Sequence, residues 1–253
     1  MLFLFDISHL VPRQYCTYRN RHPIKTPYLP KSTLRTVSIT MDSFRSQMMF
    51  TAWCWNILGL TFALNGTITL ISAYSDDENG IPEPAYLRVL MRTAFILFEI
   101  AVPTSMIVSS ITRYVLWPRS LDTTGFKTKA SLFQHNGNII VAFTEVAILG
   151  RIPMLLTYMP LGVLYGAIYI LHSWNMTHRW LPSGEPQFVY FFFDTTLDKN
   201  IVVLVLFALL CIITLFYCIS VSVSSLVTYF DGGILSNILL VVSIALGFCR
   251  FRD

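Results

Sequence analysis

Residues 131–151 read SLFQHNGNIIVAFTEVAILGR, and this stretch sets the expectation for the whole chain. It is long and apolar enough for a membrane helix, yet it carries His135, Asn136, Asn138 and Glu145. Polar side chains are costly in hydrocarbon, so they usually face the interior of a helix bundle and mark function. At about 100° per residue, His135, Asn138 and Glu145 fall within an arc of about 80°. The stretch therefore predicts a transmembrane helix with one polar, inward-facing side.

Composition extends this prediction to the full chain. Of the 253 residues, 54% are hydrophobic and only 13% are charged, and the mean hydropathy is +0.59. Soluble domains carry about 25% charged residues. The apolar residues form separate runs of about twenty, the length that crosses a bilayer, and not the short alternating strands of a β-barrel. The cysteines are odd in number and lack the paired spacing of metal ligands. We therefore expect an all-α, polytopic transmembrane helix bundle of five to six spans without a metal site.

The chain divides into an arm and a bundle. Residues 1–47 are basic and interrupted by prolines, so we expect a poorly ordered N-terminal arm near anionic headgroups. Residues 48–249 hold five longer apolar runs and a sixth that is short for a bilayer core of about 30 Å. We expect Pro103 to kink the second span, and Pro153 to lie at the start of the fourth. The predicted spans cover about residues 48–74, 89–117, 132–150, 152–174, 200–225 and 234–249.

The placement of Lys and Arg orients these spans. Basic residues are concentrated in the arm and in residues 113–131, whereas the loop after the first span is acidic. By the positive-inside rule, the arm and the 113–131 linker face the cytoplasm. This orientation puts Thr51, at the start of the first span, and His135, at the start of the third, at one shallow depth in the same leaflet.

Thr51 and His135 together suit nucleophilic chemistry. A threonine hydroxyl needs a base within hydrogen-bond reach, and neutral imidazole is the usual base near neutral pH. Such a pair at the depth of lipid carbonyls suits hydrolysis of an ester whose acyl chains stay in the bilayer. Structural interpretations compete with this hypothesis, because a threonine near a helix start often bonds to backbone and an interfacial histidine often only contacts headgroups.

The other polar side chains of the predicted spans are assigned supporting roles at the site. Asn136 and Asn138 are close to His135, so either is a candidate to orient the imidazole or to bind an oxyanion. Glu145 lies about 15 Å along the helix from His135, too far for a direct triad acid, and is assigned to helix packing or to a cavity wall. The candidates for lining that cavity are Asn65, Glu145 and His172.

Glu99, in the second span, has two interpretations. It is either a buried functional acid or the structural partner of Arg92 near the membrane interface, and we favour the ion pair. Together with Glu145 and the kinked second span, it also motivates a different function, that of a transporter or proton-coupled carrier. The symmetry-related broken helices of many transporters are not visible in the sequence. A non-catalytic membrane scaffold, in which the polar side chains only hold helices together, is a third possibility.

Several motifs occur in an order that resembles a known family. Phe50-Thr51 heads one membrane helix, and His135 precedes Glu145 by ten residues along another. Over about residues 44–220, this order resembles the androgen-induced-gene and androgen-dependent TFPI-regulating protein family of multi-pass membrane hydrolases. The family has a further helix ahead of its threonine helix, where this chain has the basic arm. That difference implies a topology inverted relative to family members.

The resemblance implies a reaction and its residues. Members of the family are threonine hydrolases that act on fatty acid esters of hydroxy fatty acids, and their nucleophile and histidine match Thr51 and His135. Thr51 would then attack the ester carbonyl while His135 removes its proton and later protonates the leaving alcohol. We expect membrane lipids and a fatty-acyl ester as partners, no cofactor and no nucleic acid. The expected location is the endoplasmic reticulum, another endomembrane or the plasma membrane.

Overall fold

The computed structural model is built from helices, with one pair of two-residue strands. It describes residues 24–25, 28–39, 43–74, 84–120, 123–230 and 232–251. For these residues the predicted all-α class is confirmed. The main helices are α3 (Phe50–Tyr74), α4 (Ala85–Ile111), α9 (Met159–Asn175), α10 (Lys199–Phe230) and α11 (Gly233–Phe248).

Shorter elements join the main helices. The strands β1 (Ile24–Lys25) and β2 (Ser38–Ile39) pair antiparallel, and α2 (Ser43–Gln47) precedes α3. Three segments are π-helical, namely η2 (Thr112–Leu116), η3 (Phe133–Gly137) and η4 (Glu145–Leu149). Two are 3₁₀-helical, namely η5 (Leu156–Tyr158) and η6 (Phe191–Phe193). The remaining short helices are α5 (Trp117–Arg119), α6 (Thr124–Lys127), α7 (Lys129–Leu132) and α8 (Asn138–Thr144).

Three helices of the described chain are long and apolar enough to cross a membrane, judged by length and composition. They cover Phe50–Ala73, Ala85–Arg119 and Lys199–Phe230, and α11 is a shorter apolar helix. The predicted third span is divided among α7, η3, α8 and η4, and the predicted fourth corresponds to α9. The structure thus provides three membrane-length helices where the sequence predicts five to six spans.

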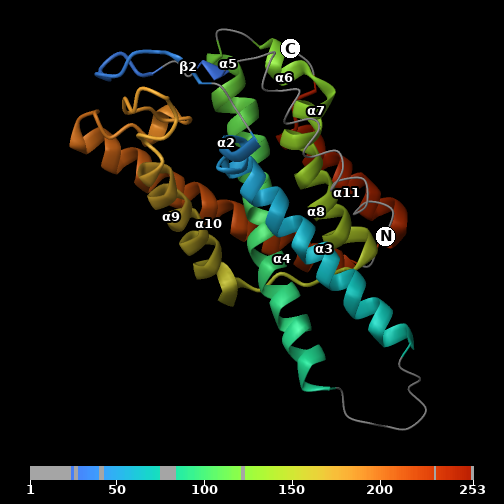
Figure 1. Cartoon of the computed structure of the whole chain (residues 1–253). Helices are drawn as coiled ribbons and strands as arrows, with labels where there is room; N and C mark the ends of the chain where they lie inside the picture. The colour runs from blue at the N-terminus through green and yellow to red at the C-terminus, as the bar shows by residue number, and fades with distance from the viewer. Residues whose placement is uncertain are drawn as a thin grey trace.

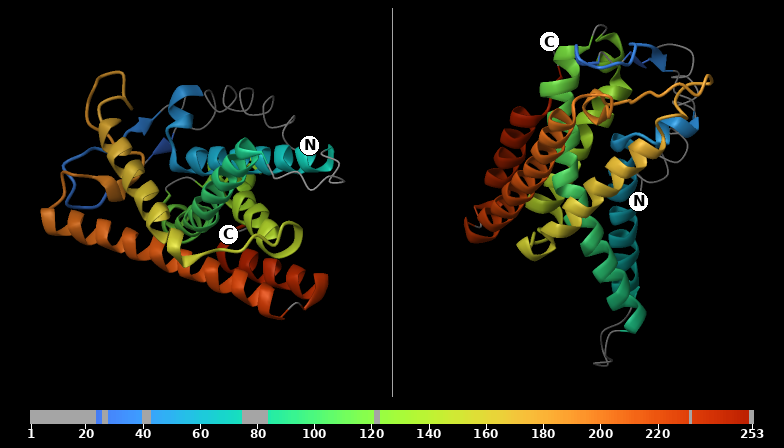
Figure 2. Two further views of the ribbon diagram at one scale, coloured as in Figure 1. Left: turned by 90° about the horizontal axis from the view of Figure 1, so that it is seen from below. Right: turned by 90° about the vertical axis from the view of Figure 1, so that its left-hand side faces the viewer.

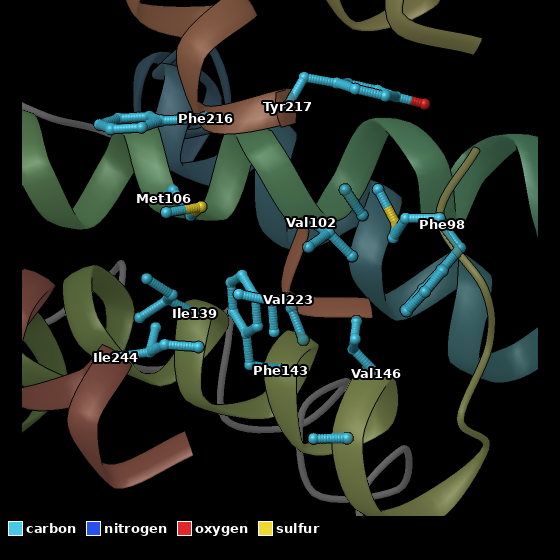
Figure 3. Packing of buried hydrophobic residues seen from close by; sticks show 14 of the residues in the cluster. Phe98, Val102, Met106, Ile139, Phe143, Val146, Phe216, Tyr217, Val223 and Ile244 are labelled. Atoms are coloured by element: carbon cyan, nitrogen blue, oxygen red, sulfur yellow. The ribbon is translucent and has the colours of Figure 1, made fainter. Parts of the chain in front are cut away.

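The bundle is organised around α4, which contacts α3, α8, α9, α10 and α11 and runs through the middle of Figure 1. Figure 2 shows α3 on one side of α4, with α10 and α11 on the other. Figure 3 shows the apolar side chains that fill the space between these helices. They come from α4 (Phe98, Val102, Met106), from α8 and η4 (Ile139, Phe143, Val146), from α10 (Phe216, Tyr217, Val223) and from α11 (Ile244).

The fourth predicted span begins later than expected. Residues 151–155 are not helical, and α9 begins only at Met159, with Pro160 in its first turn. The extended backbone is stable because side chains from other helices accept its N–H groups. Met154 N donates to Ser224 Oγ at 3.0 Å, and Leu155 N donates to Glu99 Oε1 at 2.7 Å. The helix start predicted near Pro153 is therefore wrong, and Pro160 has the role assigned to Pro153.

Part of the N-terminal arm is packed, which differs from the expected poorly ordered segment. Tyr28 accepts a hydrogen bond from Phe188 N at 2.7 Å and donates to Gln187 Oε1 at 2.7 Å. The Ser32 hydroxyl donates to the Asp194 carboxyl. Burial raises the pKa of the Tyr28 phenol to about 12, so this hydroxyl stays protonated near neutral pH. Residues 28–39 are thus held against the segment before α10, and residues 1–23 of the arm lie outside the described chain.

Candidate functional site

One cavity, of about 70 Å³, lies among the first turn of α3, the end of α4 with η2, α9, the segment that contains η6, and α10. Its wall is mostly aliphatic and aromatic, and its hydroxyl groups belong to two threonines and two tyrosines. No lining side chain is charged. The lining residues are Phe50, Thr51, Ile107, Val108, Ile111, Thr112, Leu116, Val163, Gly166, Tyr169, Ile170, Tyr190, Phe192, Phe193, Leu209, Leu210, Ile212 and Ile213.

Thr51 lies in the first turn of α3 and is 9% exposed. Other threonines of α3 behave as helical threonines usually do, because Thr61 and Thr69 donate to the carbonyl four residues earlier. The Thr51 side chain instead interacts with the Tyr190 side chain and faces the cavity. Its hydroxyl is therefore directed to a space that a ligand could enter.

Tyr190 was not among the residues predicted from sequence, and it brings a phenol to Thr51. Burial raises the pKa of Tyr190 to about 12, while hydrogen bonds to Thr51, to the Phe50 backbone and to Tyr169 oppose the rise. The phenol is therefore protonated near neutral pH and can donate a hydrogen bond. The Tyr169 hydroxyl, also on the cavity wall, donates to Met48 O at 3.1 Å.

His135 is not on the cavity wall, but it contacts Thr112, which is. Its Nδ1 lies 3.2 Å from Thr112 Oγ1, and Thr112 lines the cavity. The backbone of His135 is also fixed, because Ser109 Oγ donates to His135 O at 2.6 Å. The Phe126 ring packs on the imidazole at a centroid distance of 5.8 Å. His135 and Thr112 thus form a part-buried polar contact between the third predicted span and η2.

Both members of this contact belong to π-helical segments. Thr112 begins η2, and His135 is the central residue of η3. A π-helical turn inserts an extra residue, shifts the side chains around the helix axis and occurs frequently at functional sites. At this end of the bundle, two such turns contact one another through Thr112 and His135.

The structure brings the first turns of α3 beside η3. Trp55, one turn after Thr51, donates to Gln134 O at 2.9 Å and stacks on Phe133 at 5.1 Å. Within the described chain, no hydrogen bond joins Thr51 directly to His135. Thr51 lines the cavity, whereas His135 does not and instead contacts the lining residue Thr112.

Asn136 and Asn138, predicted to orient the imidazole or bind an oxyanion, do not line this cavity. Asn136 Nδ2 donates to Arg250 O at 2.9 Å, and Arg250 N donates to Asn136 Oδ1 at 3.1 Å. The oxygen and the nitrogen of its side-chain amide are thus both hydrogen-bonded to the backbone after α11. Asn138 is fully buried, and its Oδ1 accepts from the adjacent Ile139 N at 3.0 Å. Asn138 Nδ2 is buried without a hydrogen-bond partner. The roles predicted for the two residues at the imidazole or an oxyanion stay predictions.

Asn65, Glu145 and His172, predicted to line a cavity, are not on its wall either. Asn65 lies about 21 Å along α3 from Thr51. Glu145 packs against Gly150, where an added Cβ would lie 2.3 Å from its Oε1. The His172 ring packs on Trp53 in a tilted arrangement, with a centroid distance of 4.8 Å. Of the alternatives, Glu145 fits the helix-packing assignment.

Glu99 is fully buried and holds the connection between η4 and α9. It accepts hydrogen bonds from Leu155 N at 2.7 Å and from the Tyr217 hydroxyl. The Tyr217 hydroxyl also lies 2.9 Å from Leu155 O. Arg92, the partner expected from sequence, is exposed. Glu99 is therefore structural, as favoured, but its partners are a tyrosine and the main chain.

The described residues include no group of three or more His, Cys, Asp or Glu side chains that could hold a metal ion. The hydroxyl groups at the cavity are those of Thr51, Thr112, Tyr169 and Tyr190. Comparison of the chain with protein-family models, with curated proteins and with solved structures finds no match in any of the three.

Proposed function

We propose that this protein is an integral-membrane hydrolase of lipid esters, with Thr51 as nucleophile and His135 as base. One observation carries the proposal: Thr51 and Thr112 both line a mostly apolar cavity, and Thr112 is hydrogen-bonded to His135. A hydroxyl nucleophile needs a base near it, and an uncharged apolar wall suits acyl chains. The resemblance in motif order narrows the substrate to fatty acid esters of hydroxy fatty acids.

The reaction proceeds through an acyl-threonine. Thr51 Oγ1 attacks the ester carbonyl carbon while His135 takes the hydroxyl proton, which gives a tetrahedral oxyanion. The Tyr190 phenol, which interacts with Thr51, donates a hydrogen bond to that oxyanion. The carbon–oxygen bond to the leaving alkoxide breaks, and His135 returns the proton to it. His135 then takes a proton from water, and the hydroxide attacks the acyl-threonine carbonyl. The carbon–oxygen bond to Thr51 Oγ1 breaks, the fatty acid is released, and His135 returns the proton to Thr51.

In the proposed topology, the bundle crosses the membrane five to six times. α3, α4 and α10 are the full-length crossings. Residues 129–149, α9 and α11 complete the bundle around α4 as shorter crossings. The basic linker at 113–131 faces the cytoplasm, so the site lies in the cytoplasmic leaflet. The endoplasmic reticulum or another endomembrane is the proposed location, where such lipid substrates are available.

The test is covalent labelling with a hydroxyl-directed electrophile, such as a fluorophosphonate, on detergent-solubilised protein. Wild type is expected to label, and Thr51→Ala is expected not to. Thr69→Ala is the matched control, because Thr69 is on the same helix and only donates to Asn65 O. Failure of wild type to label, or equal labelling of Thr51→Ala, would exclude Thr51 as the nucleophile.

A further inference from the structure

Thr112 lies where the cavity wall meets His135. It lines the cavity, is 4% exposed, and its Oγ1 lies 3.2 Å from His135 Nδ1. It was not a candidate in the sequence, because nothing in its own neighbourhood marks it. Thr112 is brought to the imidazole by the packing of α4 and η2 against η3.

The hydroxyl of Thr112 has a partner that helical threonines usually lack. Thr93 and Thr104, on the same long helix, donate to the carbonyl four residues earlier, as is typical. The hydrogen-bond partner of Thr112 Oγ1 is instead a side chain on another segment. Thr112 begins the π-helical turn η2, and such a turn changes which side chains and carbonyls meet.

Two side chains on one face of the α4–η2 segment contact His135. Ser109 and Thr112 are three residues apart and therefore lie on the same side of the helix. Ser109 Oγ holds the His135 carbonyl at 2.6 Å, and Thr112 Oγ1 contacts the ring. The first contact fixes the backbone position of His135, and the second fixes the rotation of its imidazole.

Thr112 contacts one ring nitrogen of His135, and the protonation of that nitrogen determines whether the other can accept a proton. A neutral imidazole has one N–H donor and one acceptor nitrogen. When Thr112 Oγ1 accepts a hydrogen bond from Nδ1–H, Nε2 has a free lone pair and can accept the proton of a nucleophile. Orientation of a catalytic histidine through Nδ1 is the arrangement used in hydrolase triads, where the third residue holds the tautomer.

We propose that Thr112 is a positioning residue that holds His135 as the Nδ1-protonated tautomer, which leaves Nε2 as the basic nitrogen of the ring. This proposal rests on the proposed hydrolase function for its catalytic meaning. The tautomer of His135 is nevertheless a property of the resting protein and can be measured without any substrate.

The first experiment is nitrogen NMR of imidazole-labelled protein in detergent, with His135→Gln used to assign the His135 signals. We expect wild type to show a protonated Nδ1 and a bare Nε2 at His135. In Thr112→Val, which keeps the side-chain shape, we expect a mixture of tautomers, and in Thr112→Ser we expect the wild-type pattern. A protonated Nε2 in wild type, or an unchanged tautomer in Thr112→Val, would overturn the proposal.

The second experiment separates this proposal from the hydrolase proposal. The rate of Thr51-dependent probe labelling is expected to fall at least about tenfold in Thr112→Val and to recover in Thr112→Ser. Ser109→Ala, which loses only the contact to the His135 carbonyl, is expected to label faster than Thr112→Val. If wild type shows no Thr51-dependent labelling, the hydrolase proposal fails while the tautomer result stands. If it labels and Thr112→Val labels at the wild-type rate, only the positioning role fails.

Discussion

Two buried polar centres lie at different levels of this bundle, and they differ in what their atoms contact. At the first, Glu99, Tyr217 and the Leu155 backbone satisfy one another. At the second, Thr112 contacts His135, and its hydroxyl shares a cavity wall with Thr51. The polar atoms of the first centre contact one another and the main chain, whereas the second centre lies beside the cavity.

The difference shows why a polar residue in an apolar helix is not by itself a functional site. The sequence rule that polar residues within membrane helices mark function selects Glu99 and His135 equally. Glu99 is explained by a non-helical connection whose N–H groups need an acceptor. The interaction between the Thr51 and Tyr190 side chains on the cavity wall satisfies no comparable main-chain group. We therefore separate the two centres by asking which atoms remain available to a ligand.

The largest expected effect is on the cavity centre. We predict that His135→Gln lowers the rate of probe labelling by about 10²–10⁴-fold, because the nucleophile loses its base. Thermal unfolding of the same variant should stay close to wild type. His178→Gln is the matched control, since His178 is exposed and its ring contacts only the nearby Gly184 O. Labelling of His135→Gln at the wild-type rate would show that the base is another group.

The next effect concerns the phenol beside Thr51. We predict that Tyr190→Phe slows labelling by about 100-fold, because one preorganised donor to the developing oxyanion is lost. Tyr165→Phe is the control, because the Tyr165 hydroxyl is buried without a partner and does not line the cavity. Equal rates for the two variants would remove Tyr190 from the mechanism.

Substitution of Glu99 should lower the stability of the protein without changing the rate of probe labelling. Glu99→Leu leaves the Leu155 N–H without its acceptor, and a buried unpaired donor costs about 1–3 kcal/mol. We predict a lower melting temperature in detergent, with the folded protein labelling as wild type does. Glu99→Gln, which keeps a carbonyl acceptor, should melt closer to wild type. A stable Glu99→Leu variant that no longer labels would contradict the structural role and favour a functional acid.

The smallest predicted effect tests the contact between Asn136 and Arg250. Asn136→Ala loses the two hydrogen bonds to the Arg250 backbone, which we expect to reduce the free energy of unfolding by about 1 kcal/mol. Labelling should be affected far less than by Tyr190→Phe. A large loss of labelling at unchanged stability would instead restore Asn136 as an oxyanion donor.

The helices are the part of the fold that sequence alone predicts well. The runs predicted at about 48–74 and 234–249 coincide closely with α3 and α11, because apolar stretches of this length are recognisable locally. The start of α9 was not predictable, since the acceptors that hold residues 151–155 extended are Glu99 and Ser224, both distant in the chain.

The site was predictable only in part. Thr51 and His135 are recognisable by their position at the starts of apolar runs and by motif order. Thr112 and Tyr190 become relevant only through packing, because one lies at the end of α4 and the other in a loop before α10. The aromatic stretch before α10 was a visible signal, but its sequence does not reveal which ring meets Thr51. The contact of Asn136 with Arg250 was not predictable, because the two residues are 114 positions apart.

The most direct test of the central claim is to locate the adduct. After labelling of wild-type protein with the hydroxyl-directed probe, peptide mass spectrometry identifies the modified residue. We predict a single adduct on Thr51 Oγ1, lost in Thr51→Ala and strongly reduced in His135→Gln. An adduct on Thr112 or on any other residue, with Thr51 unmodified, would contradict the assignment of Thr51 as the nucleophile.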